Sequence, residues 1–310
     1  MTGATRTAAD PAADPIDRTG IPHGEPDTIE VRRVRYAWEH LPRHWVPEDP
    51  TTTHLINVLH VLLPPGERWF VKVFKEALPY IDDPVLRRRV RAFMGQEGTH
   101  AVAHTGVHEY FTAHDIDVSP MTDKLDVLFD HILHPRAVPR PFRRRYLSFL
   151  LAGVAAIEHY TAVLGQWILD EAGALDEAGA DEVMMDLIRW HGAEEVEHRS
   201  VAYDLFEHVS GSTISKVTGA GVAFPALFYL WGQTMSLLLE QDDQFQGQSQ
   251  AGMLRYYRRS VRKGMAPSRV RLFIESPKFL APWYHPSKDG NLASAIAYIA
   301  QSPSHLASNP

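Results

Sequence analysis

The chain has 310 residues, no cysteine and a formal net charge of -7 at pH 7. The lack of cysteine excludes disulfides, zinc–thiolate sites, iron–sulfur clusters and cysteine nucleophiles. The acidic balance argues against a nucleic-acid partner, because phosphate binding needs concentrated Lys and Arg. We therefore expect a globular, cytoplasmic protein that binds no nucleic acid. The chain has 17 histidines, a high number, and they are candidates for a functional site.

The first 28 residues differ in composition from the rest of the chain. They are rich in Ala, Asp, Pro, Gly and Thr and contain no apolar run of the kind that forms a secretory signal. Such a composition buries too little apolar surface to order itself. We predict a disordered tail over residues 1–28.

Apolar residues recur with helical spacing after the tail, and period-2 alternation is weak. The predicted helices cover residues 52–78, 83–114, 121–133, 141–171 and 181–209. We expect the first to break at Pro64-Pro65-Gly66. Because four helices are long and no sheet accompanies them, the pattern predicts an all-α, ferritin-like four-helix bundle over residues 29–212. The shorter helix stands where such bundles have their long crossover connection.

Residues 213–310 form a predicted C-terminal helical extension. Its first helix, 217–239, has 23 residues and no charge, which is long enough to span a bilayer. Three interpretations stay open for it: a buried helix that covers the bundle or lines a substrate channel, a membrane span, and insertion at a membrane surface. A basic helix around 253–263 can face anionic head groups or solvent, and a Pro-rich tail begins at Pro277.

Two Glu-x-x-His motifs indicate metal binding. The first pairs Glu97 with His100, and the second pairs Glu195 with His198. Residues three apart share one helix face, so each motif presents a carboxylate and an imidazole to the same side. Carboxylates and imidazoles together suit iron and similar divalent metals.

Each motif is preceded by a helix with a glutamate among apolar residues, Glu67 before the first and Glu158 before the second. Burying such a carboxylate without a positive partner would be costly. The order Glu, Glu-x-x-His, Glu, Glu-x-x-His is that of two-metal carboxylate bundles. The predicted cofactor is a pair of iron ions, with manganese or a mixed pair as alternatives. The predicted ligands are Glu67, Glu97, His100, Glu158, Glu195 and His198.

Two more histidines share the faces of these motifs. His191 lies four residues before Glu195, and His104 lies four residues after His100. We predict His191 as a seventh metal ligand, with a hydrogen bond to a ligand as the alternative. For His104 we expect a hydrogen-bonding position behind the ligands or a place in the substrate pocket. Both are candidate catalytic residues.

These residues lie in recognisable motifs: Gly66-Glu67-Arg68, Gln96-Glu97-Gly98-Thr99-His100, Glu158-His159-Tyr160-Thr161-Ala162 and Trp190-His191-Gly192-Ala193-Glu194-Glu195-Val196-Glu197-His198. In combination they resemble the bacterial family labelled predicted metal-dependent hydrolase, over most of the chain. The ligand pattern is also similar to the ferritin-like superfamily, which implies the same six ligands. His191 matches an additional His ligand of di-iron arylamine N-oxygenases. His104 stands where ribonucleotide reductase small subunits carry a radical tyrosine.

The pattern favours an oxidoreductase in which two irons activate oxygen and oxidise a small organic substrate, as an oxygenase, N-oxygenase or desaturase. One alternative is a metal-dependent hydrolase in which two metals activate water. Another is non-catalytic, ferritin-like iron binding. The expected partner is a small apolar or amine substrate. This interpretation is also compatible with an electron donor, a homodimer, and association with a membrane surface through residues 217–239.

Overall fold

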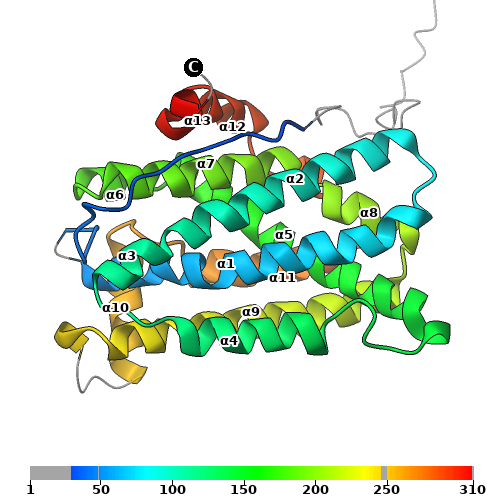
Figure 1. The fold of residues 1–310 in the computed structure, drawn as a ribbon, viewed down its shortest axis with the longest axis horizontal. Helices are drawn as coiled ribbons and strands as arrows, with labels where there is room; N and C mark the ends of the chain where they lie inside the picture. The colour runs from blue at the N-terminus through cyan, green and yellow to red at the C-terminus, as the bar shows by residue number, and fades with distance from the viewer. Residues whose placement is uncertain (1–28, 48, 246–249, 309–310) are drawn as a thin grey trace, which may run out of the picture.

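The computed structural model describes residues 29–47, 49–245 and 250–308 (Figure 1). Within these ranges every regular element is a helix, so the all-α class predicted from the sequence is confirmed. The tail predicted over residues 1–28 lies outside the described residues.

Four long helices surround the centre of the molecule. They are α1 (Pro50–Ala77), α2 (Pro84–Gly106), α5 (Arg143–Asp170) and α7 (Glu182–His198). α1 packs along α2, and α5 packs along α7 (Figure 1). Asp49, Asp83 and Asp181 cap α1, α2 and α7, because each side chain accepts hydrogen bonds from backbone N–H groups of the first turn.

The close crossing of α5 and α7 depends on two glycines. A Cβ on Gly165 would lie 2.4 Å from the carbonyl oxygen of Gly192, so a larger residue there would force the helices apart. The crossing brings Glu158 of α5 within 3.2 Å of His198 of α7. Helix packing therefore sets one edge of the cluster of carboxylates and imidazoles described below.

The break predicted at Pro64-Pro65-Gly66 is wrong, because α1 continues through both prolines. Pro64 has no N–H to offer to the carbonyl of His60, four residues earlier. His108, in α3 (His108–Ala113), donates to that carbonyl at 3.2 Å. A tertiary contact thus satisfies the group that the proline leaves free.

Shorter elements lie between and after the four long helices. They are α4 (Ser119–Val127), a π-helical turn at Leu128–Ile132, α6 (Gly173–Glu177), α8 (Val201–Val209), and single 3-10 turns at Leu78–Tyr80, Arg140–Phe142, Asp243–Phe245 and Pro286–Lys288. The helix predicted at 83–114 is therefore divided into α2 and α3, and the one at 181–209 into α7 and α8.

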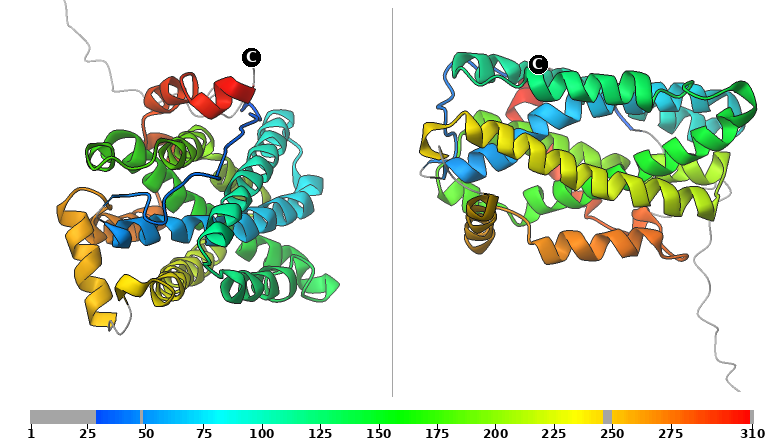
Figure 2. Two further views of the ribbon diagram at one scale, coloured as in Figure 1. Left: turned by 60° about the vertical axis from the view of Figure 1, so that its left-hand side comes forward. Right: turned by 90° about the horizontal axis from the view of Figure 1, so that it is seen from below.

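The C-terminal part adds further helices: α9 (Thr213–Glu240), α10 (Gln250–Arg262), α11 (Arg269–Leu280), α12 (Leu292–Ile299) and α13 (Pro303–Ser308). α11 packs on α5 and α9, and α12 packs on α7 (Figure 2). The Pro-rich tail predicted from Pro277 is wrong, because Pro277 lies inside α11 and two helices follow. Asn291 caps α12, which buries Ala295 and Ile299 against Val196 of α7.

Two helical segments, Arg140–Asp170 and Thr213–Glu240, are long and apolar enough to cross a membrane. In their most apolar windows 72% and 33% of the residues are buried, so the first is a core helix. The second, α9, packs one face on α1 and α5 and leaves Val217 and Val222 exposed on another. Membrane association through α9 stays a prediction.

Residues 29–47 form an irregular strap that crosses α2 and α7 (dark blue in Figure 1). Near its start, Arg32 reaches two carboxylates of α7. Further along, His44 lies 2.6 Å from the carboxylate of Asp242, which follows α9. The strap therefore ties the long helices to the end of α9.

Candidate metal centre

The six predicted ligands come together from four helices. α1 supplies Glu67, α5 supplies Glu158, and α2 and α7 each supply one Glu-x-x-His pair. All six side chains are buried. The six residues are Glu67, Glu97, His100, Glu158, Glu195 and His198.

The donor atoms of these residues lie close enough to share metal ions. His198 Nε2 lies 3.2 Å from Glu158 Oε2, 3.3 Å from Glu195 Oε2 and 3.5 Å from Glu97 Oε1. His100 Nδ1 lies 3.6 Å from both Glu97 and Glu195. Several three-residue groups place their donor atoms within 4.8 Å of one another. Glu97 and Glu195 stand between the two imidazoles, the position from which a carboxylate can bridge two metals.

Most oxygens of the cluster have no hydrogen bond to the described part of the protein. Both carboxylate oxygens of Glu67, Glu97 and Glu158 are buried and unsatisfied, as is Nδ1 of His100. Unsatisfied buried groups are costly, and buried carboxylates most of all. This donor set of carboxylates and imidazoles, aimed at one interior point, fits divalent metal ions.

The electrostatics of the cluster lead to the same conclusion. Burial, followed by repulsion from neighbouring carboxylates, raises the pKa of Glu97 to about 8 and the pKa values of Glu67 and Glu158 well above their usual range. Burial also opposes ionisation of Glu195, but the charges and hydrogen bonds of His198 and His191 hold its pKa well below the usual value. Four ionised carboxylates need positive charge beyond these imidazoles, and metal ions would supply it.

Each ligand histidine is held by a hydrogen bond on its outer nitrogen. His100 Nε2 donates to Glu194 at 2.8 Å, and His198 Nδ1 donates to the amide oxygen of Gln96 at 2.9 Å. These bonds leave His100 Nδ1 and His198 Nε2 facing the cluster. Such partners fix the ring orientation and the tautomer of a metal-bound imidazole.

The two outer partners meet at one arginine. Gln96 donates to Glu197 at 2.8 Å, and Arg32 of the strap contacts Glu194 at 2.9 Å and Glu197 at 2.6 and 2.8 Å. We call Arg32, Gln96, Glu194 and Glu197 the strap network. Sequence reasoning missed all four roles. The adjacency of Gln96 and Glu194 to predicted ligands was a signal, but the contribution of Arg32 depends on where the strap runs.

His191 and His104 lie on the other side of the cluster. His191 Nε2 is 2.9 Å from Glu195, and its Nδ1 is 2.8 Å from His104 Nε2. His104 Nδ1 is in turn 2.7 Å from Nδ1 of His60, which the sequence did not single out. Burial lowers the pKa of His60 to about 3, and burial and neighbouring imidazoles lower those of His104 and His191, so the three rings are neutral at pH 7. His191 can bind a metal through Nε2 or orient Glu195.

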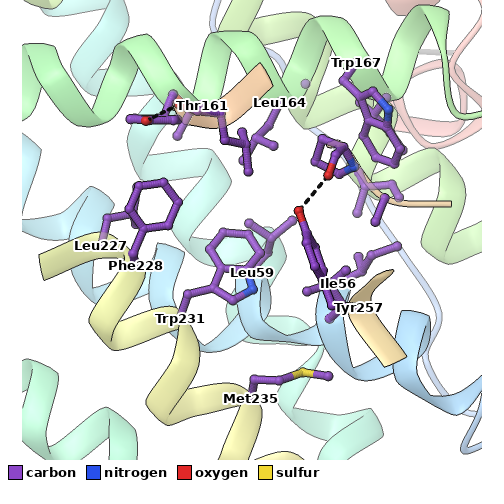
Figure 3. Close-up of a pocket in the computed structure, with 18 of the residues that line it drawn as sticks. Ile56, Leu59, Thr161, Leu164, Trp167, Leu227, Phe228, Trp231, Met235 and Tyr257 are labelled. Atoms are coloured by element: carbon purple, nitrogen blue, oxygen red, sulfur yellow. Dashed lines mark hydrogen bonds between the residues drawn. The ribbon is translucent and has the colours of Figure 1, made fainter. Parts of the chain in front are cut away.

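A pocket of about 910 Å³ begins at these histidines. Figure 3 shows part of its wall, including Leu59, Leu164 and Trp231. His104 of α2 and His191 of α7 line its inner end, and the rest of the wall comes from α1, α5, α7, α9, α10, α11 and residues 265–267. Most lining residues are apolar, such as Leu59, Leu164 and Trp231. The interpretation that the helix at 217–239 lines a substrate channel therefore agrees with the position of α9.

The comparisons with known proteins name a family. A family profile described as predicted metal-dependent hydrolase matches residues 30–290, which include every predicted ligand. No curated protein and no solved structure matched the chain, so the ferritin-like assignment stays a prediction. Because the profile covers most of the 310 residues, the chain belongs to the family of predicted metal-dependent hydrolases.

Proposed function

We propose that the cluster binds two divalent metal ions and hydrolyses a substrate that enters through the apolar pocket. The observation that carries the proposal is the meeting of four buried glutamates and two imidazoles at one point, with most of the carboxylate oxygens free of hydrogen bonds. The family description supports hydrolysis as the reaction. The family description therefore favours hydrolysis, the alternative in the sequence analysis, over oxidation.

The chain's own residues can support such a reaction. When bound, two metals polarise a substrate carbonyl and make hydroxide available near neutral pH. Glu67, Glu97, Glu158 and Glu195 would balance the charge of the metals, and the strap network would keep the imidazoles in place. His104 and His191 lie between the cluster and the pocket, within reach of a leaving group there. We assign them to proton transfer, with His191 also available as a ligand.

A second candidate is oxygen-dependent oxidation, and one observation favours it. The donor set is one glutamate from each of two helices and a Glu-x-x-His pair from each of two others, the set of di-iron and di-manganese carboxylate bundles. An apolar pocket would also keep water away from a reactive site. Iron, manganese or both could then be the cofactor, and an electron donor would be needed.

Metal analysis combined with two assays tests the proposal. We expect about two metal ions per purified chain, the number that this ligand pattern holds in related bundles. Glu97→Ala and Glu195→Ala should lose metal, while Glu109→Ala should keep it, because Glu109 is an exposed residue of α3. Ester hydrolysis is followed with p-nitrophenyl esters under argon, and oxygen uptake is followed in air with the same compounds.

Each outcome has a distinct meaning. Hydrolysis under argon that disappears in the two metal-site variants supports the proposed function. Substrate-dependent oxygen uptake without hydrolysis supports the second candidate and contradicts the first. A chain that binds no metal, or binds it equally well in Glu97→Ala and Glu195→Ala, contradicts both.

A further inference from the structure

The pocket runs from the metal cluster to the surface. Its inner end is formed by His104 and His191, which are 1% and 6% exposed. Its outer end is formed by Leu254, Arg258 and Val270, which are exposed. A volume of about 910 Å³ is near the upper limit of small-molecule sites, which is about 1,000 Å³. The pocket therefore suits an elongated ligand that reaches from solvent to the cluster.

The wall between the two ends offers little to a polar ligand. Three hydroxyl groups line it, and each already donates to a backbone carbonyl. Tyr160 donates to Leu272 at 2.6 Å, and Thr161 donates to Glu158 at 3.0 Å. Tyr257 donates to Pro267 at 2.7 Å (Figure 3). The remaining wall is rich in aliphatic and aromatic side chains, so burial of a hydrocarbon chain would be favourable along it.

The outer end carries a positive charge. Among the described lining residues, Arg258 is the one with a permanently charged side chain, and the described part of the chain holds no ion-pair partner for it. Arg255, Arg259 and Arg262 lie near it on α10. A guanidinium at the rim of an apolar pocket is complementary to a carboxylate or phosphate on a ligand whose body is apolar.

We propose that the pocket binds a long-chain acyl compound with an anionic group at one end. The anionic group lies at Arg258, the chain follows the apolar wall, and the inner part of the chain reaches His104 and His191. This assignment deepens the proposed function, on which it rests for the reaction. Binding itself does not depend on metal. The reacting bond must lie at the end of the chain away from the anionic group.

Two glycines of α9 provide a matched pair of variants. Gly232 lines the pocket, and a Cβ there would meet no atom within 4 Å, so Gly232→Phe places a ring into the open space. Gly221 has the same free surroundings but does not line the pocket. Gly221→Phe is therefore the control for an added aromatic ring on the same helix. Leu164→Trp narrows the pocket from the opposite wall, on α5 (Figure 3).

The test is binding of cis-parinaric acid, a fluorescent fatty acid, to the full chain with and without metal. We expect saturable binding that Gly232→Phe and Leu164→Trp weaken at least tenfold and Gly221→Phe leaves unchanged. Arg258→Gln should weaken binding of the acid up to about fivefold and leave its methyl ester unaffected, because the arginine is exposed and its contribution is modest. Thermal melts of each variant confirm folding.

Other results would overturn the assignment. Binding that Gly232→Phe does not change would show that the probe lies elsewhere. If Arg258→Gln weakened binding of the acid and of its methyl ester equally, the inference that Arg258 binds an anionic group would be wrong. Glu97→Ala should still bind the probe, so failure of the metal site and failure of the acyl assignment are distinguishable.

Discussion

The two sides of the metal cluster are built from opposite chemistry. On the strap side, Gln96, Glu194 and Glu197 form a buried polar network that closes on Arg32. On the pocket side, three neutral histidines form a hydrogen-bonded chain. Next to it lies a pocket of about 910 Å³ with aliphatic and aromatic walls. The strap side is filled and hydrogen-bonded, whereas the pocket side is open and apolar. Under the proposed function, the strap side positions the candidate ligands and the pocket side admits the substrate.

The comparison also explains why the ligands can be fixed without blocking the site. The histidines of the two Glu-x-x-His motifs donate their outer N–H groups to Glu194 and Gln96, which lie on the strap side. Their inner nitrogens remain directed at the cluster. His191 differs from these two histidines, because it lines the pocket and also contacts Glu195. Under the proposed function, His191 is therefore the residue that links substrate in the pocket to the candidate ligands.

The largest expected effect comes from removing the charge of Arg32. Arg32→Met leaves the carboxylates of Glu194 and Glu197 buried without their cation, and breaking a buried ion pair in this way costs about 3–5 kcal/mol. Urea unfolding of the metal-free protein measures the loss. Arg35→Met is the control, because Arg35 is exposed on the same strap. Equal stability of the two variants would mean that the strap network does not hold the cluster.

The next effect is a pH dependence of the metal-free protein. The pKa of Glu97 is raised to about 8, so this carboxyl keeps its proton in the folded chain while the unfolded chain loses it above about pH 4.5. Its contribution to stability is present below pH 4.5 and is lost as the pH rises to 8. Relative to Glu97→Gln, the wild type should lose up to about 1.4 kcal/mol per pH unit across this window.

Chemical unfolding of both proteins at several pH values checks this expectation. Titratable groups distant from Glu97 are common to both chains and cancel in the difference, whereas Glu67, Glu158 and His191 feel the charge of Glu97 and contribute to it. A difference that is constant from pH 5 to pH 8 would contradict the raised pKa. Added metal should remove the dependence, because it takes the place of the proton.

A smaller effect is expected at the outer hydrogen bond of His198. Gln96→Leu leaves His198 Nδ1 without its acceptor, and loss of such a partner lowers metal affinity about 10–100-fold. Competition with a chelator measures the affinity. Thr99→Ala is the control on the same helix, since among the described residues the hydroxyl of Thr99 bonds the carbonyl of Gly95 alone. If both variants bind metal as the wild type does, the strap side does not position the ligands.

The clustering of the candidate ligands could be predicted from the sequence because their pattern is local. Glu97 and His100 share a helix face through their spacing alone, and the all-α class follows from helical periodicity. The strap network could not be predicted, because the contact between Arg32 and Glu197 spans 165 residues and depends on the path of an irregular segment. The pocket could not be predicted either, because its lining residues come from seven of the described helices.

The wrong break in α1 has the same cause. Prolines 64 and 65 do favour a break, since each removes a helix hydrogen bond. The sequence does not show that His108 will donate to the carbonyl that Pro64 leaves free. In α1 a residue distant in sequence, His108, supplies the hydrogen-bond donor that the proline cannot supply. In the strap network a distant residue, Arg32, likewise supplies the cation for the buried carboxylates of α7.

The smallest expected effect tests whether the pocket side is open in solution. Gly232→Ala adds a methyl group where no atom lies within 4 Å, so the substitution should stabilise α9 by about 0.5–1 kcal/mol through helix propensity alone. Gly165→Ala, on the opposite pocket wall, meets the backbone of Gly192 and should instead cost about 1–3 kcal/mol. Urea unfolding measures both. A loss of stability in Gly232→Ala would mean that the wall closes in solution, in which case both sides of the cluster would be packed and substrate would need another route.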